Sequence, residues 1–135
     1  MALATSPSHL LVVWKKHGHH PCLCILRTAC TNAERWQLVT TNTVLVETYP
    51  LVLNRTRQSQ DTAITFLDHL ERTSARIERV SESDERKAMA LVRAHKDKMY
   101  SLCDAQSFVV MERLRIREAI AADEDFRQYG FRTLL

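Results

Sequence analysis

The sequence predicts an α/β fold in which helices cover a parallel sheet, and two observations support that prediction. Strand-like segments recur at 37–41, 77–80 and 119–122, and helical stretches separate them. Strands that alternate with helices are typical of a parallel sheet, because each crossover between parallel strands needs a long connection. The length of 135 residues matches one domain, so we expect residues 1–135 to form a single unit around one core.

The first third of the chain contains one clear strand. Residues 10–14 are apolar, but so short a run fits a strand or a buried helical turn, and periodicity cannot separate the two. Residues 22–33 look helical. Residues 37–41 are rich in β-branched side chains and predict a strand, after which Asn42 or Thr43 is placed to cap a helix.

The helix expected after that strand contains a proline. Pro50 lacks a backbone donor, and its ring meets the carbonyl of Val46. The conflict is worth about 3 kcal/mol in a regular helix, so we expect a kink just after Glu47.

Three later helices follow from clearer patterns. Residues 61–73 are amphipathic, Ser81 and Asp84 form an S-x-x-D capping box before the next helix, and a third helix begins near Asp104. The first places Ile64, Leu67 and Leu70 on one face with Ala63 and Phe66 beside them. The capping box of the second precedes Ala88, Leu91, Val92 and His95, and the third is expected to bury Phe108, Val109, Met111 and Leu114.

Composition indicates an ordinary globular protein. Hydrophobic residues make up 45% of the chain and charged residues 26%, and the net charge of +3 permits nucleic-acid binding without requiring it. The longest apolar runs are far shorter than the roughly twenty residues of a membrane helix. No positive charge precedes the first apolar stretch, which argues against a secretory signal and for a cytoplasmic protein with reduced cysteines.

Two aspartates stand where an open α/β sheet presents side chains to a shared cleft. Asp104 is placed at the start of a helix, and Asp123 follows the apolar run 119–122. Ligands of such sheets bind outside the carboxyl ends of the strands, and converging carboxylates suit a hard divalent cation. Each acid also has an ordinary interpretation, Asp104 as a helix N-cap and Asp123 as the start of a loop. Together they favour metal-assisted phosphate chemistry.

Three segments stand out when they are considered together. They are Leu38-Val39-Thr40-Thr41-Asn42 with Val44-Leu45-Val46-Glu47-Thr48, then Ser101-Leu102-Cys103-Asp104 with Ser107-Phe108, and finally Ala122-Asp123-Glu124-Asp125-Phe126 with Gly130-Phe131. In their order and spacing they resemble the PIN domain family, and within it the VapC-type toxin ribonucleases. The resemblance covers residues 20–135. It implies an α/β protein that binds Mg²⁺ or Mn²⁺ and cleaves RNA, commonly as a homodimer inhibited by a cognate antitoxin.

The resemblance also implies roles for particular acids. Glu47 matches the glutamate of the family's early helix, Asp104 the aspartate that opens a later helix, and Asp123 the aspartate after the last strand. These three are the implied catalytic residues and metal ligands. Asp125 matches a position where the family often has a polar residue, and it joins them as an implied metal ligand.

One acid of the family pattern is missing. The family opens with a strand that ends in Asp-Thr-Ser or a similar triplet, whereas here no Asp or Glu precedes Glu34. The most similar segment is Leu3-Ala4-Thr5-Ser6, in which Ala4 stands where the family has the acid. Either Ala4 replaces the acid, or the first twenty or so residues are not the family's native start. The chain is therefore interpreted as a ribonuclease, or alternatively as a catalytically impaired PIN-like domain that binds an antitoxin or a second subunit.

Two other groups of residues invite a function. His17, His19, His20, Cys22 and Cys24 carry zinc-binding side chains, but their spacing fits no common zinc motif, so we interpret them as loop and helix residues. We interpret Cys103 as a packing residue.

Basic residues could form a phosphate-tracking surface or a solvated face balanced by acids. They are Arg55, Arg57, Arg72, Arg76, Arg79, Arg113, Arg115 and Arg117.

Overall fold

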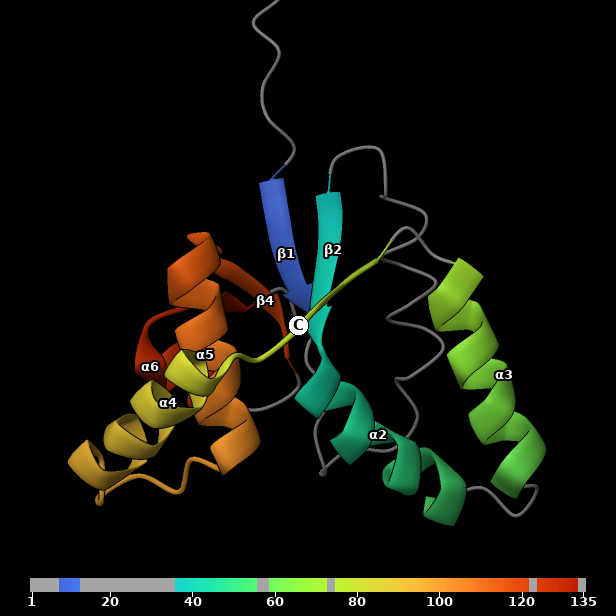
Figure 1. Cartoon of the computed structure of the whole chain (residues 1–135), viewed down its shortest axis with the longest axis horizontal. Helices are drawn as coiled ribbons and strands as arrows, with labels where there is room; N and C mark the ends of the chain where they lie inside the picture. Colours follow the sequence, from blue (N-terminus) through green and yellow to red (C-terminus); the bar gives the residue numbers. More distant parts are fainter. Residues whose placement is uncertain (1–7, 13–35, 56–58, 73–74, 122–123, 134–135) are drawn as a thin grey trace, which may run out of the picture.

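A computed structural model shows a parallel sheet flanked by helices, as the sequence predicts (Figure 1). The structure describes residues 8–12, 36–55, 59–72, 75–121 and 124–133. Its five strands are β1 (Ser8–Val12), β2 (Trp36–Thr41), β3 (Arg76–Glu78), β4 (Glu118–Ile120) and β5 (Arg132–Thr133). They lie in the order β3-β2-β1-β4-β5, and every neighbouring pair is parallel.

Five described helices accompany the sheet. They are α2 (Asn42–Arg55), α3 (Ser59–Arg72), α4 (Glu82–Ala94), α5 (Leu102–Leu114) and α6 (Asp125–Tyr129). Figure 1 shows α4, α5 and α6 on one side of the central strands and α2 with α3 on the other. Helix α2 leaves the carboxyl end of β2 directly, so its first turns lie at the edge of the sheet where ligands of open α/β folds bind.

The predicted strands are present with shifted ends. The apolar run near residue 10 is a strand rather than a helical turn, and as β1 it lies between β2 and β4. Strand β3 ends at Glu78, because Val80 turns away and its N–H donates to Asn42 Oδ1 over 2.9 Å. Strand β4 ends at Ile120. The helix predicted at 22–33 lies outside the described residues.

The start of α2 differs from its prediction. Thr41, not Asn42 or Thr43, caps the helix, since its buried hydroxyl oxygen accepts the Val44 N–H at 3.1 Å. The cap was misplaced because Thr41 is also the last residue of β2, and one side chain serves both elements. Pro50 lies inside α2 without ending it, so the kink after Glu47 stays a prediction.

Helix α3 buries a different face from the one expected. Ala63, Phe66 and Leu70 are buried, whereas Ile64 is 45% exposed, so its predicted burial is wrong. The buried three are spaced by three and four residues and form one stripe, and Ile64 lies about 100° around the helix from Ala63. This stripe explains the contact between α3 and α2.

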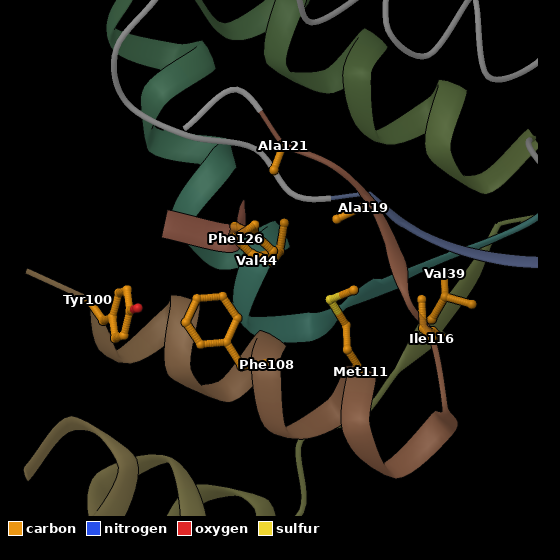
Figure 2. Packing of buried hydrophobic residues seen from close by; sticks show 9 residues of the cluster. All are labelled: Val39, Val44, Tyr100, Phe108, Met111, Ile116, Ala119, Ala121 and Phe126. Atoms are coloured by element: carbon orange, nitrogen blue, oxygen red, sulfur yellow. The ribbon is translucent and has the colours of Figure 1, made fainter. Parts of the chain in front are cut away.

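Helix α5 runs through the centre of the core. Figure 2 shows Phe108 and Met111 projecting from it toward residues of the sheet and of α2 and α6. Phe108 is fully buried and stacks on Tyr129 with ring centroids 4.3 Å apart, and Phe126 meets its face edge-on at 4.8 Å. Such aromatic pairs add about 0.5–1.5 kcal/mol each beyond area burial. The helix that carries Asp104 is therefore held in one position by its own core residues.

Helix α5 ends in a Schellman motif without a glycine. Arg115 has φ 57°, its N–H donates to the Glu112 carbonyl, and the Ile116 N–H donates to the Met111 carbonyl over 2.8 Å. Gly130 ends α6 in the same left-handed region. No helix in the described parts of the chain is long and apolar enough to cross a membrane.

Candidate functional site

The carboxylate of Asp104 is fixed by a capping box at the start of α5. Ser101 is the N-cap, and its N–H and hydroxyl both donate to Asp104 Oδ2, at 2.8 and 2.7 Å. The Asp104 N–H returns a bond to the Ser101 oxygen over 3.1 Å. Asp104 is thus the third residue of the helix and not its cap, and it is 1% exposed. Its negative charge lies beside the amino end of a helix, where the helix dipole favours an anion.

Glu47 of α2 lies near the same turn. The Cys103 side chain is half-buried, and both Glu47 and Thr43 of α2 are close enough to influence the pKa of its thiol. Burial raises the pKa of the Cys103 thiol, and the charges of Glu47 and Asp104 raise it further. Two acids 57 positions apart in the chain therefore act on one atom. Their elements, α2 and α5, are in contact.

Asp125 approaches the same region from α6. Burial raises the pKa of Tyr100, and the negative charge of Asp125, followed by that of Asp97, adds to the effect. Tyr100 is buried just before the Ser101 cap and packs edge-on against Phe108 with centroids 5.2 Å apart. Acids from α2, α5 and α6 therefore influence the pKa values of side chains in residues 100–104, which we call the acidic turn.

Carboxylate and hydroxyl oxygens at this turn suit a hard cation. Ser107 lies one helical turn after Asp104, and its fully buried hydroxyl has no hydrogen-bond partner among the residues that the structure describes. Leaving such a group unpaired costs about 1–3 kcal/mol, so a polar occupant beside it would be stabilised. Mg²⁺ typically takes one or two carboxylates and completes its shell with water. The residues at the acidic turn fit that ion, although no three Asp, Glu, His or Cys residues of the described ranges form a closed metal-binding group.

Some predicted site residues lie outside the described residues. Asp123 is one of them, and the His17-to-Cys24 group is another. Ala4 lies outside as well, but it precedes β1 in the chain, whereas the missing acid belongs at the carboxyl end of a first strand. Val13 is the residue that directly follows β1, and the replacement of the acid by Ala4 stays a prediction.

A second capping box has a different use. Ser81 and Asp84 pair as predicted, but both carboxylate oxygens of Asp84 also accept bonds from Arg113, at 3.1 and 2.9 Å. Arg113 donates to Glu78 as well over 2.9 Å, and Arg76 pairs with the other Glu78 oxygen at 2.7 Å. These bonds join β3, α4 and α5. Arg76 and Arg113 therefore form ion pairs within the fold. Of the two interpretations of the arginines, a phosphate-tracking surface and a solvated face balanced by acids, these two residues fit the second.

Sequence analysis missed one residue that shapes the site. Ser101 orients Asp104. A signal for Ser101 was present, because Ser101 to Asp104 repeats the S-x-x-D spacing of Ser81 to Asp84. Nothing in the sequence indicates the proximity of Cys103 and Glu47, because it depends on how α2 and α5 cross.

Comparisons with known proteins agree with this architecture. The model of the PIN domain family matches residues 27–132, a range that begins after β1. The chain is 37% identical over 94 residues to the 23S rRNA-specific endonuclease VapC20 of Mycobacterium tuberculosis, in both the CDC 1551 and the H37Rv strains, and the alignment covers 70% of each protein. The crystal structure of that VapC20, described as a Sarcin-Ricin loop cleaving toxin, superposes with a TM-score of 0.64 at 37% identity, covering 70% of this chain and 72% of the other.

Proposed function

This chain belongs to the PIN domain family, and on that premise we propose that it is a toxin-type endoribonuclease that hydrolyses RNA phosphodiester bonds at a Mg²⁺ or Mn²⁺ site. One observation supports the proposal above all others. Glu47 and the buried Asp104 come from α2 and α5, two helices in contact with each other, and α2 begins at the carboxyl end of β2, the edge of a parallel sheet where ligands bind.

We assign the metal to Glu47, Asp104 and Asp123, with Asp125 as a further ligand. A bound Mg²⁺ or Mn²⁺ would polarise the phosphate and lower the pKa of a bound water. Ser101 holds one oxygen of Asp104 and so fixes the direction of the other. Glu47 is exposed on α2, so a phosphate can reach it from solvent. The acidic turn would therefore orient an ion between a buried acid and an exposed one.

We propose a structured RNA of the ribosomal class as the substrate. The relative VapC20 is specific for 23S rRNA, and this chain shares 37% of the aligned residues with it. The same relationship supports a cognate antitoxin as inhibitor, a homodimer as the assembly, and the cytoplasm as the place of action. We also propose that residues 1–135 act as one domain, since the sheet is built from strands at both ends of the chain.

A second candidate function rests on the start of the chain. Beyond β1, the first acid is Glu34, so no carboxylate directly follows the strand in the middle of the sheet. A family member without that ligand could bind an antitoxin or a sister subunit and cut no RNA. If so, the purified chain is inactive, and Val13→Asp, which adds an acid directly after β1, restores cleavage.

An RNA cleavage assay tests the proposal. The purified chain with Mn²⁺ is expected to cut a ribosomal RNA fragment, and a chelator is expected to stop it. Glu47→Gln and Asp104→Asn each should lower the rate at least about a hundredfold, because ion placement on a scale of about 1 Å controls turnover. Asn keeps an acceptor for Ser101, so the helix cap survives. Asp68→Asn, an exposed change on α3, is the matched control and should leave the rate unchanged. Equal rates in all four proteins would refute the assignment.

A further inference from the structure

The positive charge of the chain is concentrated in one segment. Residues 86–98 hold five basic side chains and one acid, a net charge of +4, whereas the whole chain carries +3. The rest of the chain is therefore slightly acidic. The basic residues, which we call the basic segment, are Arg86, Lys87, Arg93, Lys96 and Lys98. A separation of charge on this scale marks a surface for an anionic partner.

Helix α4 presents the first of these cations to solvent. Its inner face packs on α5 through residues such as Ala88 and Leu91. Arg86 and Arg93 are exposed on the other side, seven residues and so two turns apart, which separates them by about 10 Å along the helix axis. Ala90 lies between them on that side and is small and exposed, so a bulky partner can approach the helix closely.

Most of these cations have no neutralising acid. Lys87, Arg93 and Lys96 are exposed and form no ion pair with an acid in the described parts of the chain. The helix dipole favours a cation only in the last turn of α4, so it accounts for Arg93 but not for Arg86 or Lys87. These charges are therefore available to an anion outside the fold.

The two pairs that do form are weak. Arg86 lies 3.3 Å from Glu82, but the two side chains are 68% and 82% exposed. Lys98 approaches Asp97 only to 3.9 Å, and Asp97 is 75% exposed. Exposed ion pairs contribute little because water and salt screen them, so both cations can exchange their acid for a phosphate.

The turn after α4 connects the basic segment with the acidic turn. The N–H and the Nδ1–H of His95 both donate to the Leu91 carbonyl, at 3.1 and 2.9 Å, and the Lys98 N–H donates to the His95 carbonyl over 3.0 Å. The His95 ring lies against Tyr100, the first residue of the acidic turn, with centroids 5.8 Å apart. Lys96 and Lys98 are thus held beside the site, and Figure 1 shows the chain passing from the end of α4 to the start of α5.

The residue types favour paired RNA over unpaired RNA. Residues 86–98 contain no Phe, Tyr or Trp, and the His95 ring already lies against Tyr100 and Tyr129. Surfaces for unpaired RNA stack bases on aromatic side chains. A paired stem is recognised by its shape and by phosphate and ribose contacts, which cations on a helix can supply.

We propose that the basic segment binds the phosphate backbone of a paired RNA stem that flanks the cleaved strand. The inference rests on the proposed function, which supplies RNA as the ligand, and it adds a contact surface outside the metal site. Because the segment ends at the acidic turn, a stem held along α4 leads the adjoining strand to the acids. Phosphate contacts fix the position of the RNA and carry no sequence information.

RNA binding in the presence of a chelator tests the inference without requiring cleavage. The full chain and its variants would be titrated with a labelled RNA hairpin, and with an unpaired strand of equal length, over a range of salt. Arg93→Gln/Lys96→Gln should weaken hairpin binding at least about tenfold at 0.1 M salt. It should also lower the slope of log affinity against log salt by about 2, one for each lost phosphate contact. The parent should prefer the hairpin, and this preference should shrink in the variant.

Two further variants separate charge at this place from charge in general. Arg72→Gln/Arg117→Gln removes the same charge from the last turn of α3 and from an exposed position before β4, and it should bind as the parent does. Arg93→Lys/Lys96→Arg keeps both cations and should also retain the affinity and the salt slope of the parent.

Three results would overturn the inference: equal affinities and slopes in the two glutamine variants, a parent without preference for the hairpin, or an Arg93→Lys/Lys96→Arg variant as weak as Arg93→Gln/Lys96→Gln. The first result would leave an acidic protein surface as the partner that fits these charges. A parent that binds the hairpin through these residues but cuts no RNA with Mn²⁺ would instead overturn the proposed function, so the two failures are distinguishable.

Discussion

At the scale of single residues, Asp84 and Asp104 show how one sequence pattern can serve two purposes. Both are third residues of a helix, both lie in an S-x-x-D capping box, and both are 1% exposed. Asp84 receives a bidentate bond from Arg113 and is neutralised within the fold. Asp104 lies instead beside the Cys103 thiol that a second acid, Glu47, also reaches. The capping boxes are readable in sequence, but the partner of each carboxylate is not, because it comes from a distant element.

The Asp84 pair should make stability depend on pH. Burial raises the Asp84 pKa, but bonds from Arg113 and Ser81 outweigh that effect and lower it below its ordinary value. A lowered pKa means that the pair stabilises the fold above about pH 4, and that this contribution is lost as pH falls through the folded-state pKa. Since Arg113 is 37% exposed, Asp84→Asn should cost only about 1–2 kcal/mol at pH 7.

Urea unfolding of Asp84→Asn and its parent at several pH values measures this effect. The difference in the free energy of unfolding between the two proteins should shrink as the pH drops below about 4, because the parent carboxylate becomes protonated. Glu85→Gln, an exposed neighbour in the same helical turn, should remain close to the parent throughout. A difference that stays constant with pH would contradict the ion-pair explanation.

At the scale of elements, the helices were predictable where their ends carry side-chain signals. The start of α4 follows from its capping box. The end of α5 has no such signal, because Arg115 occupies the left-handed position that usually takes glycine. The predicted strand ends differ by one or two residues from the observed ones, because long-range hydrogen bonds determine where strands end. The hydrogen bond from the Val80 N–H to Asn42 is an example beside β3.

Opposite substitutions at the two helix ends test the backbone strain. Arg115→Gly should stabilise the protein by about 0.5–1 kcal/mol, because a side chain at φ 57° carries a steric penalty that glycine lacks. Gly130→Ala should destabilise it by about 1 kcal/mol, since Gly130 has φ 118° and the penalty is conformational with no atom within 4 Å of an added Cβ. Thermal unfolding measures both. A destabilised Arg115→Gly would show that the arginine side chain itself contributes more than the strain removes.

At the scale of the whole molecule, the alternation of strands and helices was enough to predict a parallel sheet. It could not predict the strand order, in which the first strand lies in the middle, because order depends on which side each crossover takes. The two short elements at the carboxyl end, α6 and β5, were missed for a related reason. They are held by ring packing on Phe108 and by pairing with β4, and neither contact has a local pattern.

The arginines also fall into two groups, those in ion pairs within the fold and those that are exposed without one among the described residues. Arg76 and Arg113 are bound in ion pairs, whereas Arg79 and Arg117 are exposed and have no ion pair with an acid of the described residues. Arg79 follows β3 at the carboxyl edge of the sheet, on the side of the acidic turn, and Arg117 precedes β4 at the opposite edge. Position relative to the site therefore distinguishes two otherwise similar arginines.

RNA binding in the presence of a chelator should reflect that difference. Arg79→Ala should weaken binding and lower the slope of log affinity against log salt by about 1, as the loss of one phosphate contact predicts. Arg117→Ala is the matched control and should bind as the parent does. Equal behaviour of the two variants would mean that the carboxyl edge of the sheet does not track the RNA backbone.

The central claim is that Glu47 and Asp104 form one divalent-cation site, and a Mn²⁺ titration of the parent, Glu47→Gln, Asp104→Asn and the double variant tests it most directly. Each single substitution should weaken Mn²⁺ binding by at least the roughly tenfold that loss of an outer-shell partner already causes. The double variant should be little weaker than the singles, because both acids serve the same ion. Parent-like affinity in either single variant, or losses that simply add in the double variant, would contradict a shared site.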